Sequence, residues 1–249
     1  MANIMLRTSK FTNDAAGLEK TLRLLQSLSL IIAANVVQPA GWNQAKKQFA
    51  LGRRYLRFTK FIDCFNTAYS AFSAPGSEKS GVVVLLEVGK WSCLGIYLLL
   101  ESFTIMDAMG IWSTTWAPKL FNEAMKFWFY SLTCSLVLSL NSMKTLYMQP
   151  LEIEAKKGSG DEKTEKKTGK KVDEKPEKSE KAAKVELAKK QWYGERQVLM
   201  KKVIIDSCDL FIPATAVGWV VMRQDLLGMI MVTGTLLGCI DIWNRVNPL

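Results

Sequence analysis

Between Trp42 and Ala74 the sequence carries an apolar stripe and a basic stripe at helical spacing. The apolar positions recur in steps of four and three, which places them on one face of an α-helix. The basic positions fall on the opposite face and its edge. An aromatic face can enter the boundary between lipid headgroups and acyl chains, while Lys and Arg can contact lipid phosphates. We therefore predict an amphipathic helix over 42–74 in which Leu51, Tyr55, Phe58, Ile62, Phe65, Tyr69 and Phe72 insert into a membrane and Lys46, Lys47, Arg53, Arg54, Arg57 and Lys60 contact phosphates.

The same spacing also suits a coiled-coil seam or packing inside a protein. Five of the seven stripe positions are aromatic, however, and rings fit the holes of a coiled coil less well than Leu, Ile or Val. Nucleic acid is the other common anionic partner, but the aromatic residues lie opposite the basic ones, and no motif typical of nucleic-acid binding occurs. These features favour anionic membrane lipids as the partner over internal packing, and we expect no nucleic acid.

The residue types needed for familiar catalysis are missing. The sequence contains no His, which excludes Ser-His-Asp and Cys-His catalysis and His metal ligands. Its five Cys are far apart, lie in apolar stretches and form no CxxC pair. No Gly-rich phosphate loop or nucleophile elbow occurs. We therefore expect a protein that is not an enzyme and that binds no metal and no cofactor.

Outside the basic helix, the positive charge is concentrated in one further segment. The chain has 249 residues and a net charge of +10, and residues 151–192 are rich in Lys and Glu. A segment of this composition cannot bury enough apolar area to offset the entropy lost on ordering. We predict a disordered charged tether over 151–192, which separates an N-terminal region, 1–150, from a C-terminal region, 193–249.

The remaining sequence is helical in pattern, and it lacks the alternation typical of strands. We expect a helix from Asp14 to about Asn35, apolar helices over 81–110 and 122–148, and an apolar helical hairpin within 193–249. Gly234 and Gly238, in the last helix, have the spacing of a close helix-packing contact. The fold class is therefore predicted as all-α, a membrane-associated helical bundle with one long amphipathic helix and a disordered Lys/Glu-rich loop.

Three apolar runs raise the question of membrane spans: Val82–Leu100, Phe127–Met143 and Leu226–Ile240. A bilayer core of about 30 Å requires roughly 20 apolar residues, and none of the runs is a clean span of that kind. Each could instead be a buried helix of a soluble bundle. Their combined apolar density favours a protein that is embedded in a membrane or tightly bound to one.

The chain resembles the peroxisomal biogenesis factor 11 (peroxin-11) family, in particular its fungal members. The resemblance covers nearly the whole chain except the tether. It rests on the order and spacing of three blocks, and no single block is diagnostic. The blocks are Gly17-Leu18-Glu19-Lys20 continuing to Gln26; Arg53-Arg54-Tyr55-Leu56-Arg57-Phe58 continuing through Lys60 and Phe61 to Ala68; and Asp206, Asp209, Leu210-Phe211-Ile212, Gly238, Asp241 and Trp243.

This resemblance implies a location in the peroxisomal membrane and a role in peroxisome proliferation through membrane elongation, curvature and fission. It also implies self-association into a homo-oligomer. The partners it implies are a dynamin-related fission GTPase, the tail-anchored adaptor of that GTPase and an import receptor for peroxisomal membrane proteins.

From the residues and the resemblance together, we expect the helix over 42–74 to wedge its aromatic face into the cytosolic leaflet and so favour positive curvature. One alternative is an oligomeric channel for small metabolites, in which Glu87, Lys90, Glu101 and Asp107 would be pore or bundle-interior charges. A second alternative is a scaffold that only recruits fission factors.

Overall fold

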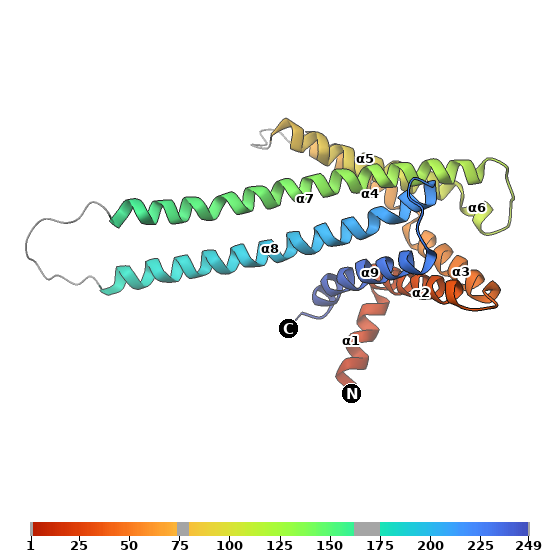
Figure 1. Ribbon diagram of the computed structural model, residues 1–249, viewed down its shortest axis with the longest axis horizontal. Coiled ribbons are helices and arrows are strands. Elements are labelled where there is room, and N and C mark those ends of the chain that lie inside the picture. Colours follow the sequence, from red (N-terminus) through yellow and green to blue (C-terminus); the bar gives the residue numbers. More distant parts are fainter. Residues whose placement is uncertain (1, 74–79, 162–174, 249) are drawn as a thin grey trace, which may run out of the picture. The chain divides into compact units, whose positions relative to one another are not determined.

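The structure is a computed structural model that describes residues 2–73, 80–161 and 175–248, without the side chains of residues 2, 149–161, 175–185 and 188. Every regular element in these ranges is an α-helix, which confirms the predicted all-α class (Figure 1). The chain divides into two compact units. Unit 1 comprises Met1–Leu138 and Ile204–Leu249, and unit 2 comprises Ser139–Val203.

Unit 1 contains six complete helices from the first half of the chain, the start of α7, the end of α8, and α9. Asp14 caps α2, because its side chain accepts hydrogen bonds from the backbone N–H groups of Ala16 and Gly17 at 3.1 Å each. The helix predicted from Asp14 to Asn35 is confirmed. The elements are α1 (Ala2–Asn13), α2 (Ala15–Asn35), α3 (Ala40–Arg57), α4 (Lys60–Ser73), α5 (Gly81–Phe103), α6 (Ile105–Ala108), α7 (Ala117–Asp161), α8 (Lys175–Val217) and α9 (Gln224–Val246).

The single helix predicted over 42–74 is two helices, so that prediction of its length was wrong. α3 ends at Arg57 and α4 begins at Lys60, with a turn at Phe58 and Thr59. At the turn the backbone N–H of Phe58 donates to Tyr55 O, an i to i−3 bond that tightens the helix end. The carbonyl of Phe58 accepts instead from the Ser102 hydroxyl of α5 at 3.0 Å. A tertiary hydrogen bond therefore replaces a helical one at this point.

Other predicted boundaries also shift. The helix predicted over 81–110 ends at Phe103, and α6 follows as a separate short helix. The helix predicted over 122–148 is the middle of α7, which continues to Asp161. The tether predicted over 151–192 is helical up to Asp161 and again from Lys175. Its central part, 162–174, lies outside the described residues, and the prediction of disorder there stays a prediction.

Two apolar clusters hold unit 1 together. In the first, Cys64 of α4 packs with Tyr97 and Leu98 of α5 and with Ala124 and Met125 of α7. The rings of Tyr97 and Trp128 stack at 5.2 Å between centroids, which joins α5 to α7. In the second cluster, Leu30 of α2 packs with Leu227 and Met231 of α9, and these helices lie side by side (Figure 1).

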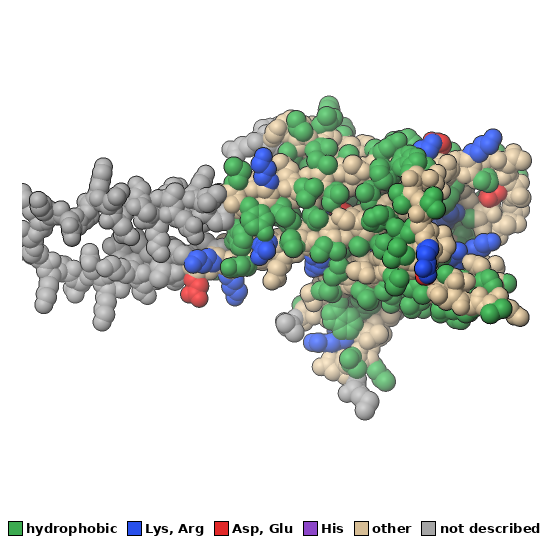
Figure 2. Space-filling view, viewed as in Figure 1, with side chains coloured by type: hydrophobic (Ala, Val, Ile, Leu, Met, Phe, Trp, Pro, Cys, Tyr) green, Lys and Arg blue, Asp and Glu red, His purple; other side chains and the backbone are tan. Residues whose placement is uncertain are grey.

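Polar and charged side chains occupy much of the remaining interior. Arg23 of α2 forms a bidentate ion pair with Asp209 of α8, and both residues are buried. The Ser135 hydroxyl of α7 donates to the carboxylate of Asp206 of α8 at 2.7 Å. Many large hydrophobic side chains are exposed on the outside of unit 1, and Figure 2 shows them spread over its visible face among polar groups. The interior therefore combines apolar clusters with many buried polar side chains, while large apolar side chains are exposed on the outside.

Two helices of the described residues are long and apolar enough to cross a membrane. These are α5 and α9, with 23 residues and a mean hydropathy of 1.8 each. Buried core helices of soluble proteins pass the same test of length and composition. In α5 and α9, however, only 17% and 28% of the apolar window is buried. Most of the other residues are half-buried or exposed, so part of each apolar surface is available to lipid.

Unit 2 is a pair of antiparallel helical segments, residues 139–161 of α7 and 175–203 of α8 (Figure 1). The indole N–H of Trp192 donates to the backbone carbonyl of Leu146 at 2.9 Å. The Tyr147 ring meets the Trp192 ring edge-on at 5.7 Å, and Arg196 Nε donates to the Tyr147 hydroxyl at 2.7 Å. An aromatic cluster therefore fixes the register of the two segments.

The contact between α2 and α9 requires a glycine at position 228. A Cβ added there would lie 2.5 Å from Ile31 Cγ1 and 3.2 Å from the Ser27 carbonyl oxygen. We expect Gly228→Ala to lower the thermal unfolding temperature of the detergent-solubilised protein. Gly194→Ala is the matched control, because a Cβ at Gly194 of α8 meets nothing within 4 Å, and Ala in an open helix stabilises by up to about 1 kcal/mol. Equal shifts for both variants would contradict this account.

The buried Arg23–Asp209 pair generates a second prediction. Removing one partner leaves a buried charge unpaired, so Asp209→Ala should lower the free energy of unfolding by about 3–5 kcal/mol. The double variant Arg23→Met, Asp209→Leu should recover most of that loss, because neither charge remains. Arg223→Ala, which breaks an exposed pair with Asp225, should change stability little. A double variant as unstable as Asp209→Ala would refute this explanation.

Candidate membrane-contacting site

Most of the predicted inserting residues lie on the outside of α3 and α4, but Phe65 is only 36% exposed and packs against Gly95 of α5. Six of the seven are exposed; only Leu51 is half-buried. Exposure is largest at the end of α4, where Tyr69 is 71% and Phe72 is 75% exposed. The stripe is therefore free to contact lipid along α4, and contact itself stays a prediction.

The three predicted phosphate-contacting arginines face the interior of unit 1, which the sequence pattern did not indicate. Arg53 is only 7% exposed. Its Nε donates to Glu19 Oε1 and its Nη1 to Gln26 Oε1, both at 2.8 Å, so it is held against α2. Arg57 Nη2 donates to both carboxylate oxygens of Glu101 in α5 at 3.0 Å.

The third arginine, Arg54, completes the same cluster. Its Nε lies 3.5 Å from Glu101 Oε1, and its guanidinium lies over the Phe121 ring, 4.5 Å from the centroid. The assignment of Arg53, Arg54 and Arg57 to lipid phosphates is therefore corrected for this conformation. Their charges are used inside the protein, because a buried guanidinium needs a carboxylate partner.

The predicted lysines differ from the arginines in position. Lys47 and Lys60 are exposed and Lys46 is half-buried. Among the described residues, Lys60 forms no ion pair. Lys47 and Lys60 thus remain the predicted cations best placed to meet a lipid headgroup.

Burial and nearby charges shift the pKa of Glu19, the acid that pairs with Arg53, in opposite directions. Burial alone would raise the pKa of Glu19, but the positive charges of Arg53, Arg57 and Lys20 outweigh it and lower the pKa to about 2. Burial likewise disfavours the charged form of Arg57, yet Tyr97, Glu101 and Glu19 raise the pKa of Arg57 above its ordinary value. Both groups are therefore charged at neutral pH, as an ion-paired helix contact requires.

Sequence reasoning missed Glu19 as a site residue and left Glu101 open as a pore or bundle-interior charge. Glu101 is buried and accepts hydrogen bonds from Arg57 and from the Tyr97 hydroxyl at 3.0 Å each. In this structure it is an interior charge. An available signal was the excess of cations in 42–74: six basic residues with one acid require carboxylates from elsewhere if any are buried.

Gly234 and Gly238 lie where α9 approaches other helices closely. A Cβ at Gly234 would be 3.3 Å from Cys208 Cβ of α8. One at Gly238 would be 3.3 Å from Lys20 Cε of α2. Both positions face the inside of unit 1, so the packing they allow is within the chain.

The described part of the chain contains no group of three or more His, Cys, Asp or Glu side chains that could hold a metal ion.

The lowered pKa of Glu19 predicts how stability depends on pH. In the unfolded chain Glu19 has its ordinary pKa of 4.5, and in the fold its pKa is about 2. The stabilisation is therefore present above pH 4.5 and is lost as the pH falls towards 2, by on the order of 3 kcal/mol. Glu19→Gln should remove this part of the pH dependence, measured by chemical unfolding between pH 5 and 2. Glu123→Gln, at an exposed pair with Lys126, is the control, and identical acid profiles for wild type and Glu19→Gln would disprove the assignment.

Comparison with known proteins identifies the family. The chain matches the family model for Peroxisomal biogenesis factor 11 (PEX11) over residues 5–243. It is 26% identical over 241 residues to Peroxisomal membrane protein PMP27 of Saccharomyces cerevisiae, and the alignment covers 95% of this chain and 93% of the yeast protein. No solved structure matches the chain. With a family match over nearly its full length and two helices able to span a bilayer, the chain belongs to the peroxisomal biogenesis factor 11 family and is a peroxisomal membrane protein that takes part in peroxisome proliferation.

Proposed function

We propose that the chain drives peroxisome proliferation mechanically, by placing the exposed aromatic face of α3 and α4 in the cytosolic leaflet and so bending the membrane. The observation that carries the proposal is the orientation of these helices. Their arginines are paired inside the protein, and Tyr55, Phe58, Tyr69 and Phe72 are exposed. Catalysis plays no part in this role.

The exposed stripe is costly in water and favourable in lipid. Fully burying one large apolar side chain contributes roughly 1.5–3 kcal/mol. Tyr69, Phe72 and Ile62 are all at least half exposed, so several such contributions become available when α4 contacts acyl chains. Tyr rings in addition favour the interface, where the hydroxyl stays hydrated.

α4 packs antiparallel along α5. Phe65 contacts Gly95, and Cys64 packs with Tyr97 and Leu98. In the proposed arrangement α4 lies shallowly in the cytosolic leaflet, with its exposed side chains among the acyl chains. Its cross-section then expands that leaflet, and expansion of one leaflet favours curvature towards that side.

The charges near the end of α5 suit this placement. Arg54, Arg57 and Glu101 lie close to Phe103, the last residue of α5. Charged groups near a helix end can reach the headgroup region. Lys60, exposed at the start of α4, is then in position to meet anionic headgroups, each such contact being worth about 1 kcal/mol.

Vesicle deformation tests the proposal. The full chain is reconstituted into anionic vesicles, and tubules are counted by electron microscopy. We expect tubules from the wild-type chain and a several-fold loss with Tyr69→Glu, Phe72→Glu, because the carboxylates resist insertion. Val198→Glu changes an exposed apolar residue of unit 2 and should leave tubulation unaltered.

Equal tubulation by the Tyr69→Glu, Phe72→Glu variant would refute the wedge. Circular dichroism confirms that each variant is folded before the comparison. Because the assay contains no other protein, tubulation in it also separates this role from that of a scaffold that only recruits fission factors.

A further inference from the structure

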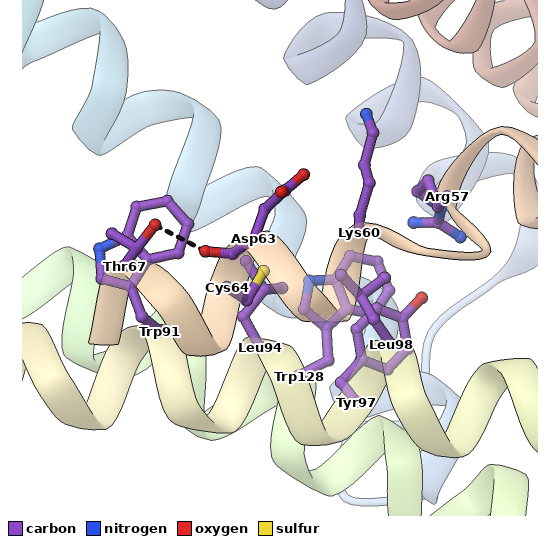
Figure 3. A pocket seen from close by; sticks show the side chains of 10 residues that line it. All are labelled: Arg57, Lys60, Asp63, Cys64, Thr67, Trp91, Leu94, Tyr97, Leu98 and Trp128. Atoms are coloured by element: carbon purple, nitrogen blue, oxygen red, sulfur yellow. Dashed lines mark hydrogen bonds between the residues drawn. The ribbon is translucent and has the colours of Figure 1, made fainter. Parts of the chain in front are cut away.

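A pocket of about 430 Å³ lies in unit 1 between α4, α5 and α7 (Figure 3). This volume falls within the range of pockets that bind small ligands. Most of its wall is apolar, with Trp91 and Leu94 of α5 and Trp128 of α7 among the lining residues. The stacked rings of Tyr97 and Trp128 form one flat part of that wall.

The two ends of the pocket differ in charge. Figure 3 shows Arg57 and Lys60 near Tyr97 and Leu98 at one end, and Thr67 and Trp91 at the other. Residues 60 and 67 of a helix are about 10 Å apart along its axis. The pocket is thus elongated along α4, with a basic end and an apolar end.

The basic end retains unused hydrogen-bonding capacity. Arg57 Nε is buried and has no hydrogen-bond partner among the described residues, although Nη2 of the same guanidinium binds Glu101. Lys60 forms no ion pair within the described part of the chain. The one acid that lines the pocket is Asp63, one turn further along α4. Glu101, paired with Arg57, and Asp63 offset two of the three cations Arg54, Arg57 and Lys60, so this cluster keeps one excess positive charge. An unpartnered buried donor such as Arg57 Nε is a feature that a ligand would satisfy.

We propose that this pocket binds a long-chain acyl amphiphile with a negatively charged headgroup. The acyl chain lies against Trp91, Leu94 and Trp128, and the headgroup accepts hydrogen bonds from Arg57 Nε and Lys60. A free fatty acid and an anionic phospholipid share this chemistry. The site is distinct from the exposed stripe, because it would hold the headgroup and the adjoining part of one acyl chain inside unit 1 rather than lay side chains into bulk lipid.

Site-resolved photolabelling tests the proposal. The full chain is placed in nanodiscs of zwitterionic phosphatidylcholine and exposed to a palmitate analogue with a diazirine in its chain and a terminal alkyne. We expect saturable crosslinks to peptides that contain Trp91, Leu94 and Trp128. Unlabelled palmitate should compete, and hexadecanol, which lacks the charge, should not. Phosphatidic acid with the same photoreactive chain forms the second arm, and the tighter competitor identifies the source of the ligand.

Two variants with matched controls separate the pocket from general contact with lipid. Thr67→Trp fills the apolar end from an exposed position and should abolish the saturable labelling, whereas Ser70→Trp, exposed on α4 but not lining the pocket, should retain it. Lys60→Gln should weaken binding on the order of tenfold, and Lys47→Gln should not.

Labelling that does not saturate, or that Thr67→Trp leaves unchanged, would overturn the proposal. Flat nanodiscs report binding without any change of membrane shape. Failure here is therefore distinguishable from failure of the vesicle deformation that tests the membrane wedge.

Discussion

The ion pairs made by the arginines of α3 determine how the membrane-facing part of this protein is arranged. Arg53 binds Glu19 of α2, and Arg57 binds Glu101 of α5. A charged side chain is buried only with a partner, because the free energy needed to desolvate an unpaired ion exceeds the free energy gained from packing. α3 therefore has one orientation in which its arginines are satisfied. In that orientation the aromatic residues on its opposite side face outward, and the turn at Phe58 and Thr59 continues this exposure along α4.

The same constraint is met throughout unit 1. Arg23 pairs with Asp209, Ser135 binds Asp206, and most residues of α5 and α9 are half-buried or exposed rather than buried. In water this distribution would be unfavourable, since polar groups can be hydrated outside at no cost. In a bilayer the hydrocarbon core offers no hydrogen bonds, and polar side chains are satisfied only inside the protein. The many polar side chains inside unit 1 are therefore consistent with its location in a membrane, because they find hydrogen-bond partners there that hydrocarbon does not supply.

The proposed wedge and the proposed lipid pocket use different sides of α4. Ile62, Tyr69 and Phe72 are exposed on one side, whereas Cys64 and Thr67 line the pocket between α4, α5 and α7. Lys60 stands at the start of both. A bound acyl chain would fill the space beside Trp91 and Trp128 and so support the packing of α4 on α5. In the proposed wedge, the exposed side of α4 would then enter the leaflet as part of a well-packed helix pair.

The sequence by itself determined the helical class, the Asp14 cap, the apolar character of α5 and α9, and the existence of an aromatic face opposite a basic one. These properties follow from local spacing, because residues three and four apart share a helix face. It did not determine which face points inward, and the expectation that the arginines reach lipid phosphates was wrong for Arg53, Arg54 and Arg57 in this conformation. That orientation depends on Glu19 and Glu101, which lie 34 and 44 residues away from the arginines they bind. At the break between α3 and α4, the Phe58 carbonyl likewise meets a distant partner, the Ser102 hydroxyl of α5. Only the tertiary structure decides such features, because a buried charge is placed by the partner that neutralises it rather than by its neighbours in the chain.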